Sequence, residues 1–109
     1  MKLIIAIIQN ADRRALSAAL RRAHIQHTRL NTTGGFLHEG NTTVLIGVEP
    51  EQVETTLELI QKHCHERTVI YRPGAGAMHP DAYVSPVHVT LGGATVFVVE
   101  ATPHKIGGS

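Results

Sequence analysis

The 109-residue chain has a formal net charge of +1 and only 17% charged residues, so it offers neither a basic stripe for nucleic-acid phosphates nor a charged block typical of a disordered tail. Its single cysteine, Cys64, cannot form an internal disulfide, which argues against a small secreted scaffold and favours a cytoplasmic protein. The length fits one domain, so we expect a single domain over residues 1–109, with residues 102–109 as a loosely ordered tail.

The first two elements are predicted to be a central strand and an amphipathic helix. Residues 2–8 (KLIIAII) form a nearly continuous run of leucine and β-branched residues, which is typical of a strand in the middle of a sheet. The run is short and no small-residue cleavage site follows it, which favours a strand over a signal peptide. A helix is expected over 11–23, with its apolar residues on one face and Asn10 as its N-cap.

Two strands are predicted next, on either side of a glycine-rich segment. Residues 25–31 alternate weakly between polar and apolar, which would place His24, Gln26 and Thr28 on one face of the strand. Residues 42–48 (TTVLIGV) are rich in β-branched residues and form the next strand. The unusual stretch NTTGGFLHEG therefore lies between two strands.

The remainder of the chain predicts a helix, a long loop and short strands. Pro50 at the first helical position opens a helix that ends near residues 63–67. Glycines and prolines are dense in residues 72–86, which predicts a long irregular loop. Strands are expected at 68–71, 87–91 and 94–101. The pair Gly92-Gly93 is expected to turn the last two strands into a hairpin.

This order of elements predicts the fold class. It is the split βαβ arrangement, an α+β, ferredoxin-like βαββαβ fold with a long loop between the second helix and the C-terminal strands. Such a fold places two helices on one face of a sheet. The chain has no third layer for the other face, so we expect that face to be covered by oligomerisation.

Neither a metal site nor a catalytic site is predicted. His63 and His65 flank Cys64, but residues i and i+2 of a helix point about 200° apart, and the cysteine fits the apolar seam of the helix. No serine or cysteine lies in a recognisable nucleophile elbow. Acylphosphatase-like chemistry would need an arginine in a phosphate cradle directly after the first strand, where this chain has Gln9-Asn10.

The stretch NTTGGFLHEGNTTVLIG, residues 31–47, allows two interpretations. Its glycines permit positive φ, so backbone N–H groups could form an anion-binding nest, with Phe36 beside it to stack on a nucleotide base. Alternatively, Gly34-Gly35 is only a turn, Phe36 belongs to the core and Asn41 forms an Asx turn. The residues by themselves leave both interpretations open.

Three stretches carry a resemblance that extends from the start of the chain to about Ala101. They are MKLIIAIIQ, LNTTGGFLHEGNTTVLIGV and VTLGGATVFVV. Together they resemble the PII-like family of bacterial cyclic di-AMP receptors, which are related to the nitrogen-regulatory PII signal transducers. The resemblance implies a homotrimer with its sheets lining the trimer core and a cyclic di-AMP site in each cleft between neighbours. It also implies a receptor with no enzymatic activity and no cofactor, whose loop at 68–86 alters an unidentified protein partner.

The resemblance also implies which residues bind the ligand. They are Thr28, Gly35, Phe36, Leu37, Asn41, Gly47 and Phe97. Thr28 and Asn41 would contact an adenine or a phosphate, and Gly47 would offer main-chain groups to a base edge. The Gly-Phe-Leu segment would wrap the ligand through backbone and apolar contacts.

Two positions depart from the family's pattern. They often hold Asn and Arg, and here they are His24 and Gln26. Losing the arginine removes a charge-assisted hydrogen bond, typically worth about 1.5–3 kcal/mol, although His24 could restore some charge when protonated. His24 and Gln26 remain part of the predicted ligand-binding site. The departures also support an alternative function, a PII-like trimeric interaction module whose ligand specificity is lost or altered to another nucleotide.

Overall fold

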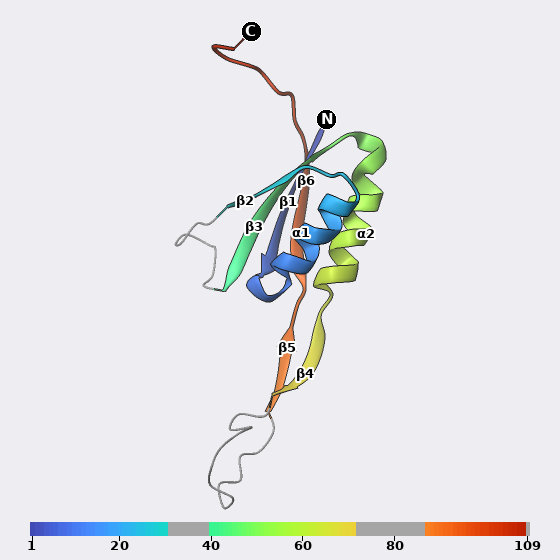
Figure 1. Cartoon of the computed structure of the whole chain (residues 1–109), viewed down its shortest axis with the longest axis vertical. Coiled ribbons are helices and arrows are strands. Elements are labelled where there is room, and N and C mark those ends of the chain that lie inside the picture. The colour runs from blue at the N-terminus through green and yellow to red at the C-terminus, as the bar shows by residue number, and fades with distance from the viewer. Residues whose placement is uncertain (31–39, 72–86, 109) are drawn as a thin grey trace, which may run out of the picture.

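A computed structural model of the chain describes residues 1–30, 40–71 and 87–108. These residues form a four-stranded antiparallel sheet, two helices on one of its faces, and a separate two-stranded extension (Figure 1). The sheet contains β1 (Lys2–Gln9), β2 (His27–Leu30), β3 (Asn41–Val48) and β6 (Ala94–Glu100), in the order β2-β3-β1-β6. The helices are α1 (Arg13–Arg22) and α2 (Val53–Cys64), and the extension pairs β4 (Arg67–Tyr71) with β5 (Val87–Leu91). The predicted α+β, ferredoxin-like fold is confirmed.

Strand β1 is the centre of the sheet, as its continuous apolar sequence predicts. It pairs along its length with β3 on one side and with β6 on the other. Because side chains alternate along a strand, Ile4, Ala6 and Ile8 share one face, and each is at most 1% exposed beneath the helices. The residues between them lie on the opposite face of the sheet.

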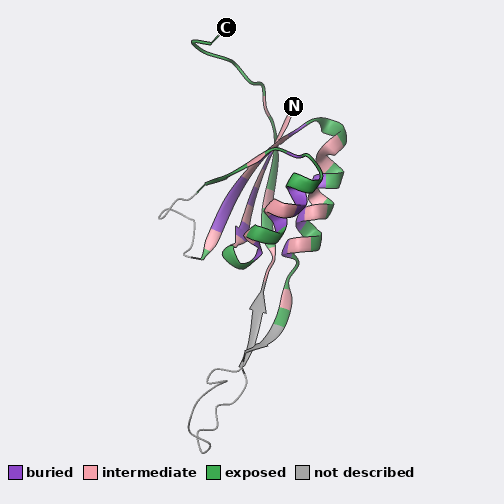
Figure 2. Ribbon diagram, viewed as in Figure 1, coloured by how far each residue is buried: buried purple, intermediate pink, exposed green. Residues whose placement is uncertain are grey.

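The hydrophobic core lies between the sheet and the two helices (Figure 2). Leu16 and Leu20 of α1 and Ile60 of α2 are at most 3% exposed. Cys64 is 1% exposed at the end of the same seam of α2, which confirms its predicted place in the apolar face of the helix. In the ranges that the structure covers, no helix is long and apolar enough to cross a membrane.

Asn10 does not cap α1, and the helix begins at Arg13 rather than at residue 11. The backbone N–H of Asn10 donates to the carbonyl oxygen of Gly40 at 2.8 Å, and its side-chain oxygen accepts the hydroxyl hydrogen of Thr42. Asn10 therefore ties the end of β1 to the start of β3. A 3₁₀ turn over Asn10–Asp12 occupies the residues where the first helical turn was expected.

Gly92 and Gly93 do not form the predicted hairpin turn. β5 pairs with β4 and β6 pairs with β1, so the two glycines connect the extension to the main sheet. Their φ angles are +86° and +90°, and a Cβ atom on Gly92 would lie 2.1 Å from the carbonyl oxygen of His65. Gly92 therefore permits a close backbone approach, and both glycines adopt backbone angles that disfavour other residues. The prediction was wrong because a glycine pair does not reveal the pairing partners of the strands beside it.

The described residues leave the sheet face opposite the helices uncovered. Cross-strand register places Leu3 beside Val99, and Ile5 beside Phe97, on this face. Phe97 is 52% exposed and Val99 is 42% exposed. This agrees with the sequence-based expectation that a chain of this length has no layer for the second face of its sheet. Below, the face is called the open face.

Candidate functional site

An open cleft of about 790 Å³ lies where the end of α1 meets the start of β2. Its lining residues are Met1, Arg21, His24, Ile25, Gln26, His27, Thr28, Leu45 and Gly47. Four of the nine predicted ligand-binding residues are among them, namely His24, Gln26, Thr28 and Gly47. The volume falls in the range of small-molecule sites, roughly 300–1,000 Å³. Below, this cleft is called the α1–β2 end cleft.

His24 lies in the end cleft because of the way α1 terminates. The N–H of Ile25 donates to the carbonyl of Leu20 at 2.9 Å, and the N–H of His24 donates to the carbonyl of Arg21 at 3.0 Å. These two bonds form the Schellman motif, in which the residue after the C-cap adopts the left-handed conformation. His24 has a φ of +58°, and no other non-glycine residue in the described ranges has a positive φ. Asparagine and histidine tolerate this conformation better than most residues.

Because of the way α1 ends, the strand predicted over 25–31 begins later than expected. β2 begins at His27, so His24 and Gln26 precede the strand and do not share a strand face with Thr28. They nevertheless line the same cleft as Thr28. The family that this chain resembles often has asparagine at position 24. Histidine, like asparagine, tolerates the left-handed backbone conformation.

Thr28 and Phe97 lie on the same open face of the sheet but at opposite edges. Thr28 is opposite Leu45, which is opposite Ile5, which is opposite Phe97. Three strand spacings of about 4.8 Å separate the first residue from the last, or roughly 14 Å. Phe97 is therefore outside the end cleft within this chain.

Asn41 is also remote from the end cleft within this chain. It is opposite Gln9, at the far end of β3 from Gly47. Six residues of extended strand span roughly 20 Å. The predicted residues Gly35, Phe36 and Leu37 fall in 31–39, outside the described residues, and so do the alternatives of a Gly34-Gly35 turn and a core Phe36.

Met1 forms a rim of the end cleft over Gly47. A Cβ atom on Gly47 would lie 3.0 Å from the Met1 side-chain methyl, so the absence of a side chain at this position admits the methionine. The carbonyl oxygen of Met1 accepts the N–H of Ala101 at 3.1 Å, and its amino group lies 3.9 Å from a carboxylate oxygen of Glu100. A hydrogen bond from Lys2, together with its charge, lowers the pKa of Glu100. The start of the chain is thus anchored beside the cleft.

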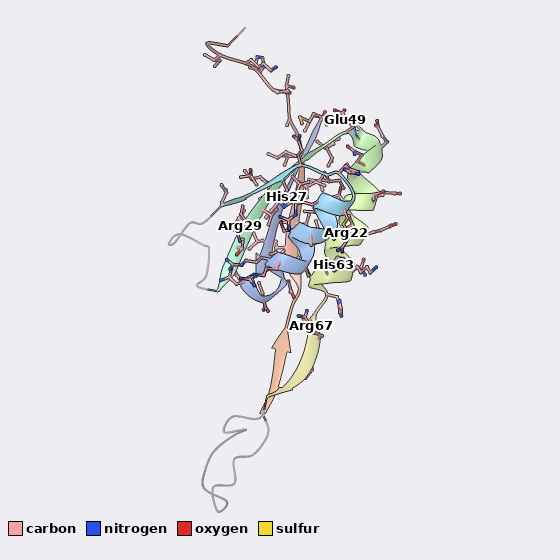
Figure 3. All side chains as sticks on the ribbon, in the orientation of Figure 1. Arg22, His27, Arg29, Glu49, His63 and Arg67 are labelled. Atoms are coloured by element: carbon pink, nitrogen blue, oxygen red, sulfur yellow. The ribbon has the colours of Figure 1, made fainter. Side chains whose placement is uncertain are left out.

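His27 and Arg21 are cleft residues that the sequence did not single out. His27 is labelled in Figure 3. Its Nδ1 lies 3.3 Å from the carbonyl oxygen of Ile25, and its Nε2 lies 2.7 Å from the Ser17 hydroxyl. A carbonyl can only accept, so the neutral ring that satisfies both contacts carries its hydrogen on Nδ1 and accepts the Ser17 hydroxyl hydrogen. Arg21 was missed because its position in a helical arginine pattern is typical of a solvent-exposed face.

Cys64 is chemically isolated from this cleft. Burial, followed by the nearby charge of Asp12, raises the pKa of the Cys64 thiol to about 11. The thiol is therefore protonated at neutral pH and is a poor nucleophile and metal ligand. Over the described ranges, no three His, Cys, Asp or Glu side chains are grouped to hold a metal ion.

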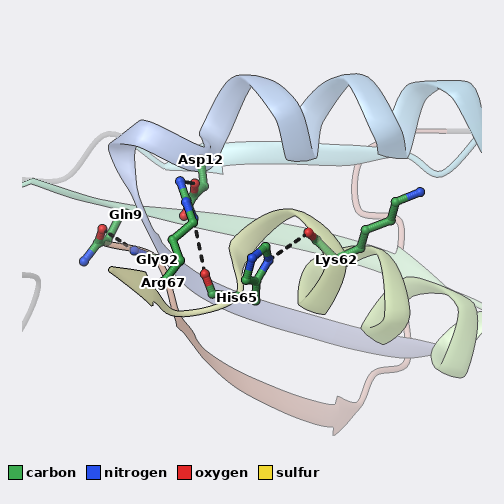
Figure 4. Close-up of polar contacts among 6 residues, drawn as sticks. All are labelled: Gln9, Asp12, Lys62, His65, Arg67 and Gly92. Carbon is green, nitrogen blue, oxygen red and sulfur yellow. Dashed lines mark hydrogen bonds and ion pairs between the residues drawn. The ribbon is translucent and has the colours of Figure 1, made fainter. Parts of the chain in front are cut away.

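A set of polar contacts joins the two-stranded extension to the rest of the fold (Figure 4). Arg67 donates to Asp12 Oδ1 at 2.8 Å and to the carbonyl oxygen of His65 at 3.2 Å. The N–H of Gly92 donates to Gln9 Oε1 at 2.7 Å. Asp12 is 3% exposed, and the hydrogen bond to it raises the pKa of Arg67 above its usual value. Both strands of the extension are thereby fixed at the end nearest the sheet.

Comparison with known proteins yields matches that span almost the whole chain. The family model described as cyclic-di-AMP receptor matches residues 1–105. The structure is also similar to the crystal structure of a functionally unknown protein from Pediococcus pentosaceus ATCC 25745, with a TM-score of 0.76 and 39% sequence identity. That match covers 96% of this chain and 95% of the other.

Proposed function

The chain belongs to the cyclic-di-AMP receptor family, and from this premise we propose that it is a non-enzymatic receptor that binds cyclic di-AMP between subunits. The observation that carries the proposal is the convergence of His24, Gln26, Thr28 and Gly47 on one open cleft. These residues come from a helix end, a strand start and a neighbouring strand. The cleft is thus assembled by the fold and is not a local feature of one loop.

The geometry supports a site that is shared between subunits. Thr28 and Phe97 occupy opposite edges of one sheet face, and Asn41 lies at the far end of β3 from the end cleft. A single ligand can contact all of them only if a neighbouring subunit supplies some. The open apolar face supports the same arrangement, because a homotrimer would bury it against two further copies.

The proposed signal passes from the ligand to an unidentified protein partner in the cytoplasm. The segment 68–86 would change on binding, and its first residues belong to β4 of the extension. The contacts of Arg67 and Gly92 join this extension to the 3₁₀ turn before α1 and to β1. Residues 1–109 would act as a single PII-like domain, with 102–109 as a loosely ordered tail.

Arg21 is proposed to supply the cationic contact that Gln26 does not. It lies in the last turn of α1 and lines the end cleft together with Gln26 and Thr28. None of the ion pairs found among the described residues involves its guanidinium group. It is therefore available for a phosphate of the ligand.

Calorimetric titration of the purified protein with cyclic di-AMP tests the proposal. Cyclic di-GMP, ATP and cyclic AMP serve as parallel ligands, and the mass of the assembly is measured with and without ligand. We expect saturable heat with cyclic di-AMP, no heat with cyclic di-GMP or cyclic AMP, and a trimeric mass. Absence of heat at high micromolar cyclic di-AMP would refute the ligand assignment and leave the fold unaffected.

A second function, a trimeric interaction module with lost or altered ligand specificity, is favoured by Gln26 in place of the family's frequent arginine. A thermal-shift screen of nucleotides separates the two functions. A ligand present at a hundred times its Kd stabilises the folded protein by about 2.7 kcal/mol. Stabilisation by cyclic di-AMP supports the receptor, whereas no stabilisation by cyclic di-AMP supports the interaction module.

A further inference from the structure

A second cleft lies between the exposed side of α1 and β2. Its lining residues are Arg13, Arg14, Ser17, Ala18, Arg21, His27, Thr28 and Arg29. It shares Arg21, His27 and Thr28 with the end cleft. Arg13, Arg14 and Arg29 belong to the second cleft only. Below, it is called the arginine cleft.

The arginines converge on this cleft for reasons that follow from helix and strand geometry. Arg14 and Arg21 are seven residues apart, two helical turns, so they lie along one stripe of α1. Arg29 pairs with Val44, which is 3% exposed on the sheet face covered by the helices. Arg29 therefore projects from the edge strand toward the helix side, and Figure 3 shows it on the β2 side of α1.

The cleft concentrates positive charge in a protein whose net charge is only +1. Four arginines line it, and the ion pairs among the described residues involve only Met1, Lys2, Arg67 and their two acidic partners. Like charges gathered in a concave surface repel one another, and this repulsion is relieved when an anion binds. Guanidinium groups bind phosphate oxygens in bidentate geometry.

We propose that the arginine cleft binds a compact polyphosphate anion, either inorganic triphosphate or the phosphate chain of a nucleoside triphosphate. The cleft is concave and is lined by both a helix and a strand. Such a shape fits a compact ligand better than it fits the flat surface of another protein. Four guanidinium groups match the several charges of a triphosphate. A cyclic dinucleotide has only two phosphodiester charges, so the two clefts are expected to differ in their ligands.

The test is calorimetric titration of the full chain with sodium triphosphate and, separately, with ATP, in buffer without divalent cations. The double variant Arg14→Gln/Arg29→Gln removes two guanidinium groups that belong only to this cleft. The control Arg22→Gln removes an arginine of the same helix that lines neither cleft. We expect wild type and the control to bind triphosphate alike, and the double variant to bind at least about tenfold more weakly. Thermal melting of each variant shows that it is folded.

Equal affinity for both anions would support recognition of the phosphate chain alone, and tighter binding of ATP would support a nucleoside triphosphate. Absence of binding to either anion at millimolar concentration would overturn the proposal. An equal loss in the Arg22→Gln variant would also overturn it, because net charge alone would then account for binding. Binding of a short polyglutamate peptide but of neither anion would overturn it in favour of an acidic protein segment.

Titration with cyclic di-AMP tests whether the two clefts are separate binding sites. We expect the double variant to retain the wild-type affinity for cyclic di-AMP, and a matching loss would overturn the assignment of a separate site. Failure of wild type to bind cyclic di-AMP would refute the proposed receptor function. The triphosphate result would stand independently of that failure.

Discussion

Arg21 lies in the lining of both clefts, at the point where α1 ends. A guanidinium group supplied from a helix end can replace one supplied from the segment between that helix and the next strand, provided that both reach the same phosphate. Gln26 retains hydrogen-bonding capacity but has no charge. At the scale of single residues, the cationic contact in the end cleft is thus expected to have moved from position 26 to Arg21.

The Arg21→Gln variant tests this expectation. It should weaken cyclic di-AMP binding by about tenfold or more, because a charge-assisted hydrogen bond to phosphate is lost. The Arg22→Gln variant has the same change in net charge and should bind as wild type does. Equal affinities of all three proteins in calorimetric titration would show that Arg21 does not contact the ligand.

Cys64 should make the stability of the protein sensitive to alkaline pH. Burial raises the pKa of its thiol from 9.0 to about 11. Below pH 9 the thiol is protonated in both states. Between pH 9 and 11 the unfolded state releases its proton first, so the free energy of unfolding should fall by roughly 2–3 kcal/mol. Urea unfolding of wild type and Cys64→Ala across this range is the measurement, and parallel pH profiles would contradict the prediction.

The end of α1 is the element that shapes the end cleft. Its Schellman motif turns the chain at His24 and places Ile25, 5% exposed, back in the core. The polar side chains of His24 and Gln26 are consequently left at the surface, where they line the cleft. The end of α1 thus buries Ile25 in the core and also positions two candidate ligand-binding residues.

Substitutions at His24 should separate these two roles. His24→Gly removes the cost of a left-handed conformation and should raise the free energy of unfolding by up to about 1 kcal/mol. His24→Val places a β-branched residue there and should lower it by about 1–2 kcal/mol. Urea denaturation measures both changes. Equal stability of the two variants would show that residue 24 does not require this backbone conformation.

The junction between the extension and α1 depends on the Arg67–Asp12 pair. Asp12 is 3% exposed and its Oδ2 has no hydrogen-bond partner in the described part of the chain, so the carboxylate relies on Arg67. Arg67→Gln should lower the free energy of unfolding, because the buried Asp12 carboxylate would lose its charged hydrogen-bond partner. The additional Asp12→Asn substitution should recover part of this loss. Strict additivity of the two single changes in denaturation experiments would show that the residues are not coupled.

At the scale of the whole molecule, the open face is the feature that supports the proposed oligomer. It holds large apolar side chains in cross-strand contact, with Phe97 and Val99 substantially exposed. An apolar patch of this kind is typical of an interaction surface. The proposed trimer would bury this surface and would also bring residues of neighbouring subunits to the end cleft.

Two adjacent valines on β6 provide a matched test of the assembly. Val99 lies on the open face opposite Leu3, whereas Val98 lies on the helix side opposite Ile4. They are 42% and 43% exposed, respectively. Val99→Asp should dissociate the oligomer because it would bury an unpaired charge, and Val98→Asp should preserve it. Light scattering after size-exclusion chromatography measures the masses, and a trimeric Val99→Asp variant would contradict the proposed interface.

Local sequence patterns determined the elements, the fold class and the lack of a covering layer for the second sheet face. Continuous apolar residues marked β1 as central, and helical periodicity placed Cys64 in the core, because these patterns depend only on residues close in the chain. Tertiary structure decided the roles of Gly92-Gly93 and His24, since strand partners and helix termination depend on non-local contacts. It also decided that Arg21 joins Thr28 and Gly47 in one cleft, which long-range packing alone brings together.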